Sequence, residues 1–286
     1  MNVNTLTLKG RELSALGSVR PKPSQLFWSG TAPDVILPMP RVAIVGSRKA
    51  TDYGRSVTRR LASELSRCGV VVISGLAFGI DSCAHRAVLE SGGCTVAVLP
   101  TPLGNIAPAA HASLAEQILQ EGGALVSEYG PGADVYKKNF IARNRIVAAL
   151  ADALVITEAA RNSGSLHTAR FALEQGKTVM AVPGNINSPA SEGCNNLIKS
   201  GALPVTESGD IFFALGIRRR TVQADTAFKG TPQQQTIFGL IADGTSQQEE
   251  LASASRLAPS EVSSALTALE LRGYIRPAGA GHWTAY

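Results

Sequence analysis

Short, almost continuously apolar runs recur between residues 41 and 207, and a segment with helical periodicity follows each of them. Unbroken apolar runs are typical of strands that helices cover on both faces. The intervening segments place apolar residues on one helical face, as at Val57, Leu61 and Leu65. This alternation predicts an α/β fold, a doubly wound and mostly parallel Rossmann-like sheet, with strands at 42–46, 70–75, 95–100, 124–128, 153–158, 178–184 and 203–207.

The remaining segments predict further parts around this Rossmann-like domain of residues 41–216. Residues 1–40 contain five prolines and one short apolar run, so we expect a lead-in that packs on the sheet edge. Residues 217–231 are polar and basic and are interpreted as a linker. Residues 232–286 show three helical segments and a hairpin with a glycine-rich tip, which predict a small winged-helix-like domain.

The positive charge is distributed unevenly along the chain. The net charge is +5, but residues 232–286 hold three basic and five acidic residues, so this part carries −2 and the rest carries +7. Basic residues concentrate in segments 130–150 and 211–231, which favours a polyanionic partner for the large domain. The helix over 261–270 carries two glutamates and no basic residue, so we expect the winged-helix-like domain to bind protein or nothing.

Several classes of protein find little support in the sequence. The four cysteines form no CxxC pair and no zinc-like cluster with histidine, so we expect free thiols and no metal site. No run approaches the length of a membrane helix, and the start of the chain lacks the pattern of a signal peptide. We therefore expect a cytoplasmic protein that does not bind a membrane.

Polar and glycine residues follow the ends of the first two strands of the expected sheet, where open parallel sheets bind ligands. Asp81 and His85 lie four positions apart in the next helix, and Asp81 is as compatible with a helix cap as with a ligand contact. Glycine allows close backbone approach, and hydroxyl and guanidinium groups bind phosphate. These features predict a phosphate site at Ser47, Arg48, Lys49, Ser74, Gly75 and Gly79.

Cations and aromatic residues interleave after the fourth strand. Lys137 and Lys138 precede Phe140, and Arg143, Asn144 and Arg145 follow it. Cations that follow phosphates beside a ring that stacks on bases are typical of single-stranded nucleic acid binding, although Phe140 fits a packing role at the helix start equally well. Because Arg143 and Arg145 point to different sides of a helix, we expect one to bind DNA and the other to anchor the fold.

Six motifs together resemble those of the DprA/Smf family, the DNA-processing proteins of natural transformation. They are GSRKATDYG, SGLAFGIDSCAH, SEYGPG, FIARNRI, NSGSLHTA and AVPGNINSPASEGCNNLIKSGA, in this order. The resemblance covers about residues 21–286. Phe78 and Ile141 depart from it, since the family has arginine and proline at these positions.

The resemblance implies a homodimeric Rossmann-like domain that binds single-stranded DNA, protects it and helps to load the RecA recombinase onto it. The family's pocket maps to Ser47, Arg48, Ser74, Gly75, Gly79, Phe140, Arg143 and Asn144. No cofactor and no catalytic residue are implied.

Two alternatives from other classes remain open at this point. A LOG-like phosphoribohydrolase shares the expected fold, but its reaction needs a carboxylate where this chain reads RNSGSLHTAR. Glu128 or Glu158 could supply a displaced acid, although we expect each to pair with an arginine and order a loop. A nucleotide-sensing regulator could use the same pocket for a small ligand.

Overall fold

The computed structural model describes residues 5–9, 16, 19–217, 230–242, 245–279 and 281–285. Its residues form two compact units, Met1–Arg218 and Arg219–Tyr286. Each unit has its own hydrophobic core. Most of the basic linker expected at 217–231 lies outside the described residues.

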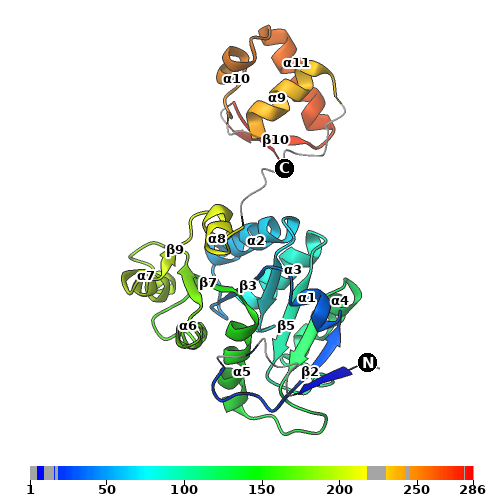
Figure 1. Cartoon of the computed structure of the whole chain (residues 1–286). Helices are drawn as coiled ribbons and strands as arrows, with labels where there is room; N and C mark the ends of the chain where they lie inside the picture. Colours follow the sequence, from blue (N-terminus) through cyan, green and yellow to red (C-terminus); the bar gives the residue numbers. More distant parts are fainter. Residues whose placement is uncertain are drawn as a thin grey trace. The chain divides into compact units, whose positions relative to one another are not determined.

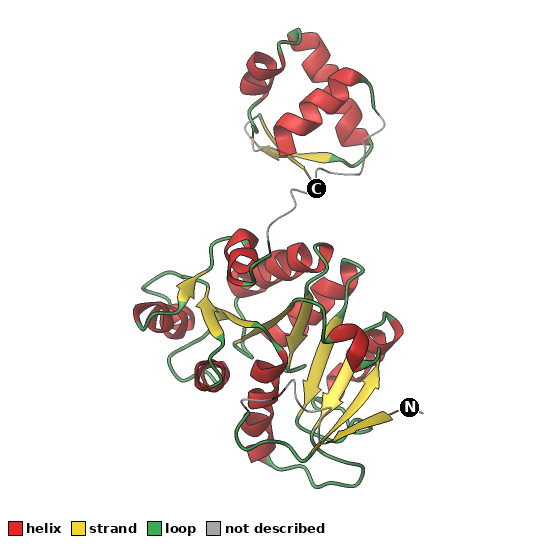
Figure 2. Ribbon diagram, in the orientation of Figure 1, coloured by secondary structure: helices red, strands yellow, loops and turns green. Residues whose placement is uncertain are grey.

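A nine-stranded sheet forms the centre of the first unit, in the order β1-β2-β6-β5-β4-β3-β7-β8-β9 (Figures 1 and 2). Neighbouring strands from β6 to β9 are parallel. The predicted Rossmann-like fold and its seven strands are confirmed, and the strands are β3 (Arg41–Gly46), β4 (Val71–Ser74), β5 (Thr95–Leu99), β6 (Ala124–Ser127), β7 (Ala153–Glu158), β8 (Thr178–Ala181) and β9 (Leu203–Pro204).

The lead-in segment adds two antiparallel strands to one edge of this sheet. β2 (Gln25–Gly30) pairs with β6, and β1 (Thr5–Lys9) pairs with β2. Trp28 is buried and its indole N–H donates to the carbonyl of Thr31 at 2.7 Å. The segment therefore extends the sheet, in addition to packing against it.

Helices cover both faces of the parallel strands, as the unbroken apolar runs require. Alternate residues of one strand enter different cores: Ala43 packs with α5 and α6, whereas Ile44 packs with α2, α3 and α8. The helices are α1 (Pro33–Ile36), α2 (Asp52–Arg67), α3 (Ile80–Glu90), α4 (Ala112–Gln120), α5 (Lys137–Leu150), α6 (Ser165–Glu174), α7 (Glu192–Lys199) and α8 (Ser208–Ala214).

The described residues of the second unit form three helices and a two-stranded antiparallel sheet. Its core gathers Ile237, Leu251, Leu266 and Ile275 from all three helices and the first strand. This arrangement confirms the predicted winged-helix type. The elements are α9 (Pro232–Ala242), α10 (Gln248–Ser255), α11 (Pro259–Leu271), β10 (Ile275–Gly279) and β11 (His282–Ala285).

Candidate nucleic-acid interface

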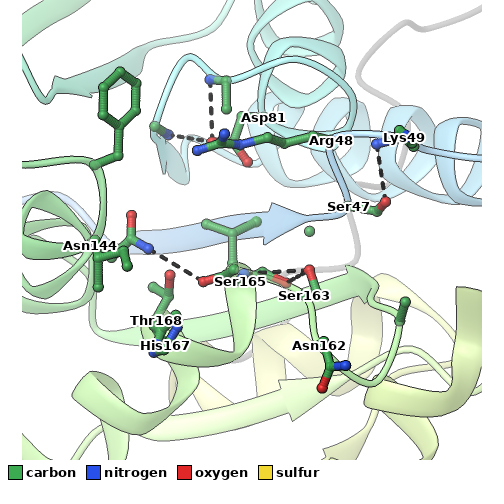
Figure 3. Close-up of a pocket in the computed structure, with 18 of the residues that line it drawn as sticks. Ser47, Arg48, Lys49, Asp81, Asn144, Asn162, Ser163, Ser165, His167 and Thr168 are labelled. Atoms are coloured by element: carbon green, nitrogen blue, oxygen red, sulfur yellow. Dashed lines mark hydrogen bonds between the residues drawn. The ribbon is translucent and has the colours of Figure 1, made fainter. Parts of the chain in front are cut away.

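A cavity of about 1040 Å³ opens at the carboxyl ends of β3, β4 and β7. The first turns of α5, the loop from β7 to α6 and the segment before α7 complete its wall. In Figure 3, Arg48 and Asp81 lie on the upper side of this cavity and Asn162, Ser163 and Ser165 on the lower side. The position agrees with the general rule for open parallel sheets.

Two glycines let the β3 and β4 loops approach closely. A Cβ atom at Gly46 would lie 2.6 Å from Ile80 Cγ1 and 2.7 Å from the carbonyl oxygen of Glu158. Gly79 has φ +80° and its missing Cβ would overlap the carbonyl oxygen of Ser47, to which Ile80 N–H donates at 3.1 Å. The exposed side chains of Arg48 and Lys49 therefore extend from a fixed backbone.

Asp81 holds the loop between β4 and α3 in place through hydrogen bonds to its backbone. Its Oδ2 accepts from the backbone N–H groups of Gly75 at 3.2 Å and Ala77 at 3.4 Å. Burial raises the pKa of this carboxyl, and the nearby Arg143 lowers it to a smaller extent. Asp81 thus holds the loop before α3 and lines the cavity, but it does not cap the helix, whose N-cap residue is Gly79 without a side-chain cap bond.

Arg143 lies outside the cavity lining, beneath the β4 loop. Its buried guanidinium donates to the carbonyl oxygens of Gly75 and Val98, and burial lowers its pKa to about 10. Arg145, two positions further along α5, is also buried and donates to Glu128 at 2.6 Å. Both arginines therefore anchor the fold. The expectation that one of them projects to DNA does not match these positions.

Ser74 is a second predicted site residue whose polar atom faces inward. Its buried hydroxyl donates to the carbonyl oxygen of Ile44 at 2.6 Å. Ser74 and Arg143 therefore differ from the expectation of direct DNA contact, because their polar atoms are already bonded to backbone within the sheet. They hold the loops of the cavity in place.

Cations and one aromatic ring meet at the cavity rim. The Arg48 guanidinium lies over the half-buried ring of Phe140, 5.7 Å from its centroid. Lys137 lines the same cavity, whereas Lys138 lies over the ring of Tyr136 outside the lining. Within the described ranges, none of these cations forms an ion pair with a carboxylate.

The structure thus brings most of the predicted site residues to one cavity. Those that line it are Ser47, Arg48, Lys49, Gly75, Lys137, Phe140 and Asn144. Those outside the lining are Ser74, Gly79, Lys138 and Arg143.

The loop between β7 and α6 adds polar groups that the sequence analysis did not include in the site. Asn144 Nδ2 donates to the carbonyl oxygen of Gly164 at 3.5 Å, which joins this loop to α5. The hydroxyls of Ser163 and Ser165 lie 2.8 Å apart (Figure 3). The strand-end rule alone would have indicated this loop, which also contributes Arg161 and Asn162 to the cavity, while His167 and Thr168 enter it from the start of α6.

The two strand-end glutamates have different partners. Glu128 pairs with Arg145, as predicted. The same prediction is wrong for Glu158, whose carboxylate accepts from the backbone N–H of Thr51 at 3.0 Å and from the Thr51 hydroxyl. Gly54 leaves the space for it, since a Cβ there would lie 2.6 Å from Oε2. Glu158 is therefore held at the N-terminus of α2 and does not line the cavity.

The described residues offer neither a cluster of metal ligands nor a membrane-spanning helix. These residues contain no group of three or more histidine, cysteine, aspartate or glutamate side chains placed to hold a metal ion. None of the helices in the described ranges is long and apolar enough to span a membrane.

The solved structures similar to this chain include two DNA processing proteins. DNA processing protein A from Streptococcus pneumoniae is 37% identical with a TM-score of 0.68, and the match covers 73% of this chain and 74% of that one. DNA processing protein A from Helicobacter pylori, whose structure is described for its single-stranded DNA binding mode, is 31% identical with a TM-score of 0.67. That match covers 75% of this chain and 96% of the other.

Comparison of sequences points to the same family. Protein Smf of Escherichia coli is 39% identical over 250 residues, which cover 85% of this chain and 67% of that protein. The chain spans about two thirds of the length of the curated relatives it matches. The family model of DNA recombination-mediator protein A matches residues 11–216, and that of the DprA winged helix domain matches residues 222–281. The chain therefore belongs to the DprA/Smf family of DNA recombination-mediator proteins.

Proposed function

We propose that this chain binds single-stranded DNA in the cavity at the ends of β3, β4 and β7. The observation that carries the proposal is the contact between Arg48 and Phe140, a cation and a ring that meet beside Lys49 and Lys137. In the part of the chain that the structure describes, neither lysine forms an ion pair with a carboxylate. Cations that follow the phosphates and a ring that accepts a base are the two elements of sequence-tolerant single-strand binding. The printed description of the Helicobacter pylori relative supports the same ligand.

The groups at the cavity are suited to binding more than to turnover. Glu158, the acid closest in sequence to the β7 loop, is engaged by Thr51. Asp81 is engaged by two backbone N–H groups, and burial raises the pKa of its carboxyl. Glu192, the other carboxylate of the lining, pairs with Arg161 at 3.7 Å. With these acids engaged, we propose a binding protein without catalysis.

A biological role follows from family membership. We propose that the bound strand is protected in the cytoplasm and passed to the RecA recombinase, and that the chain acts as a homodimer. A direct test follows the ATPase activity of RecA on single strands covered by single-strand-binding protein. Addition of this chain is expected to shorten the lag. An unchanged lag, together with tight DNA binding, would contradict the loading role alone.

Binding itself is tested by titrating the protein against oligo-dT, a duplex of the same length and thymidine monophosphate at several salt concentrations. We expect binding of oligo-dT with a steep salt dependence, weaker binding of the duplex and no measurable binding of the mononucleotide. Preference for the mononucleotide would instead support a nucleotide-sensing regulator.

A further inference from the structure

An exposed aromatic ring outside the cavity lining has no role in the site described so far. Phe78 lies in the loop between β4 and α3 and is 49% exposed. Its neighbour Ala77 lines the cavity, and the next residue, Gly79, packs its backbone against Ser47 and Arg48. The Phe78 ring therefore belongs to the same group of strand-end loops as the cations.

The Phe78 ring is braced from one side by a buried histidine. The rings of Phe78 and His111 form an edge contact, with centroids 4.7 Å apart and planes at 61°. His111 is itself fixed, because its Nδ1–H donates to the carbonyl oxygen of Leu76 at 2.8 Å. Since a carbonyl only accepts, this bond also determines the histidine tautomer.

The loop that carries Phe78 is held at several backbone positions. Leu76 has φ 57°, a left-handed conformation that is strained for a leucine, and its side chain is fully buried. Asp81 accepts from Gly75 and Ala77, and Ile80 donates to Ser47. An exposed ring on a fixed loop loses little conformational freedom when a planar ligand stacks on it.

We propose that Phe78 is a second base-stacking platform for the strand whose phosphates Arg48 contacts. This inference rests on the proposed function, and it extends that function by naming a further residue that binds a nucleobase. The Phe78 ring is half exposed and braced by His111, and it precedes Gly79, whose backbone packs against Arg48. Such a planar π-face suits a base in the same way as Phe140 does. The platform adds affinity without adding a phosphate contact.

The test compares Phe78→Ala, Phe78→Leu and Phe78→Tyr in the full chain, with oligo-dT and an abasic strand of equal length as probes. Leucine retains apolar bulk against His111 but has no π-face, whereas tyrosine retains the face. We expect alanine and leucine to weaken oligo-dT binding about fivefold to a hundredfold and tyrosine to bind as the parent does. On the abasic strand all four proteins are expected to bind alike.

The slope of log K against log salt is expected to stay the same in all variants, because phenylalanine neutralises no phosphate. Parent-like binding of oligo-dT by Phe78→Leu would overturn the platform. An equal loss on the abasic strand, or a reduced salt slope, would overturn it as well, since the loop would then act through Arg48. If the parent protein itself does not bind oligo-dT, the proposed function is contradicted. That result is distinguishable from the outcomes above, in which the parent binds oligo-dT and only the role of Phe78 is contradicted.

Discussion

The Arg48 guanidinium lies over the Phe140 ring although the two residues come from segments far apart in the sequence, the β3 loop and the first turns of α5. The ring holds the side chain at the cavity rim without neutralising its charge. A carboxylate partner would have kept that charge from a phosphate. This pairing leaves the full positive charge available to a polyanion.

Arg48→Ala is expected to weaken oligo-dT binding and to lower the salt slope by about 0.7, the value for one phosphate contact on a single strand. Salt-titrated fluorescence anisotropy measures both quantities. Arg67→Ala is the matched control, because Arg67 is exposed in the last turn of α2, about 24 Å along the helix from its start. A parent-like slope in Arg48→Ala would contradict the predicted phosphate contact.

Lys137→Ala is expected to affect DNA binding, and Arg143→Met is expected to affect the stability of the fold. Lys137 is exposed at the cavity, so its loss weakens DNA binding and leaves the free energy of unfolding unchanged. Arg143 is buried, and its loss leaves the carbonyls of Gly75 and Val98 without their donor and removes the cation near Asp81. Urea titration is expected to show a loss of about 3–5 kcal/mol. Equal stability of the two variants would refute the role given to Arg143.

His85 is expected to make stability depend on pH. The Thr95 hydroxyl donates its single proton to the Val72 carbonyl, so it accepts from His85 Nδ1–H and leaves the buried Nε2 without proton or partner. Burial, followed by repulsion from Arg143, lowers the pKa of His85 to about 3. A protonated ring would bury an unpaired N–H group.

The sign of the effect follows from this lowered pKa. The unfolded chain takes up the proton below about pH 6.5 and the folded chain does not. The contribution of His85 to the free energy of unfolding is therefore fully present above pH 6.5. It decreases by about 1.4 kcal/mol per pH unit as the pH falls toward 3. Urea unfolding between pH 7.5 and pH 4.5 is expected to show a smaller loss in His85→Gln than in the parent. Parallel curves would argue against a neutral His85.

Glu158→Gln is expected to lower the free energy of unfolding by about 1–2 kcal/mol, because a negative charge at the start of α2 and an acceptor for Thr51 are both weakened. Neither protein is expected to release adenine from adenosine monophosphate, with or without magnesium. Chromatography of the free base measures this. Release by the parent that disappears in Glu158→Gln would revive the hydrolase alternative.

A chain ending at residue 217 is expected to retain most of the affinity for oligo-dT. The cavity and its cations lie within the first unit, whose cores do not include residues of the second. Residues 218–286 carry seven basic and six acidic residues, so their removal lowers the net charge of the chain by only one. A folded truncation that no longer binds oligo-dT would place the site elsewhere.

The sequence by itself determined the fold of the large domain and the position of its candidate site. Strands covered on both faces must be apolar throughout, so runs such as 42–46 and 153–158 are visible without any structure, and the carboxyl ends of parallel strands meet at one edge. Arg48, Lys137 and Phe140 were predicted as site residues for this reason, and the structure brings them to one cavity.

Only the tertiary structure decided which polar side chains face that cavity and which are bonded beneath it. The burial of Arg143 and Ser74 depends on carbonyls of other strands, Val98 and Ile44, that come near them only when the sheet is assembled. The partner of Glu158 is likewise Thr51 at the start of a neighbouring helix, a position that the spacing of residues does not reveal. A side chain's orientation depends on partners distant in sequence, so no local pattern encodes it.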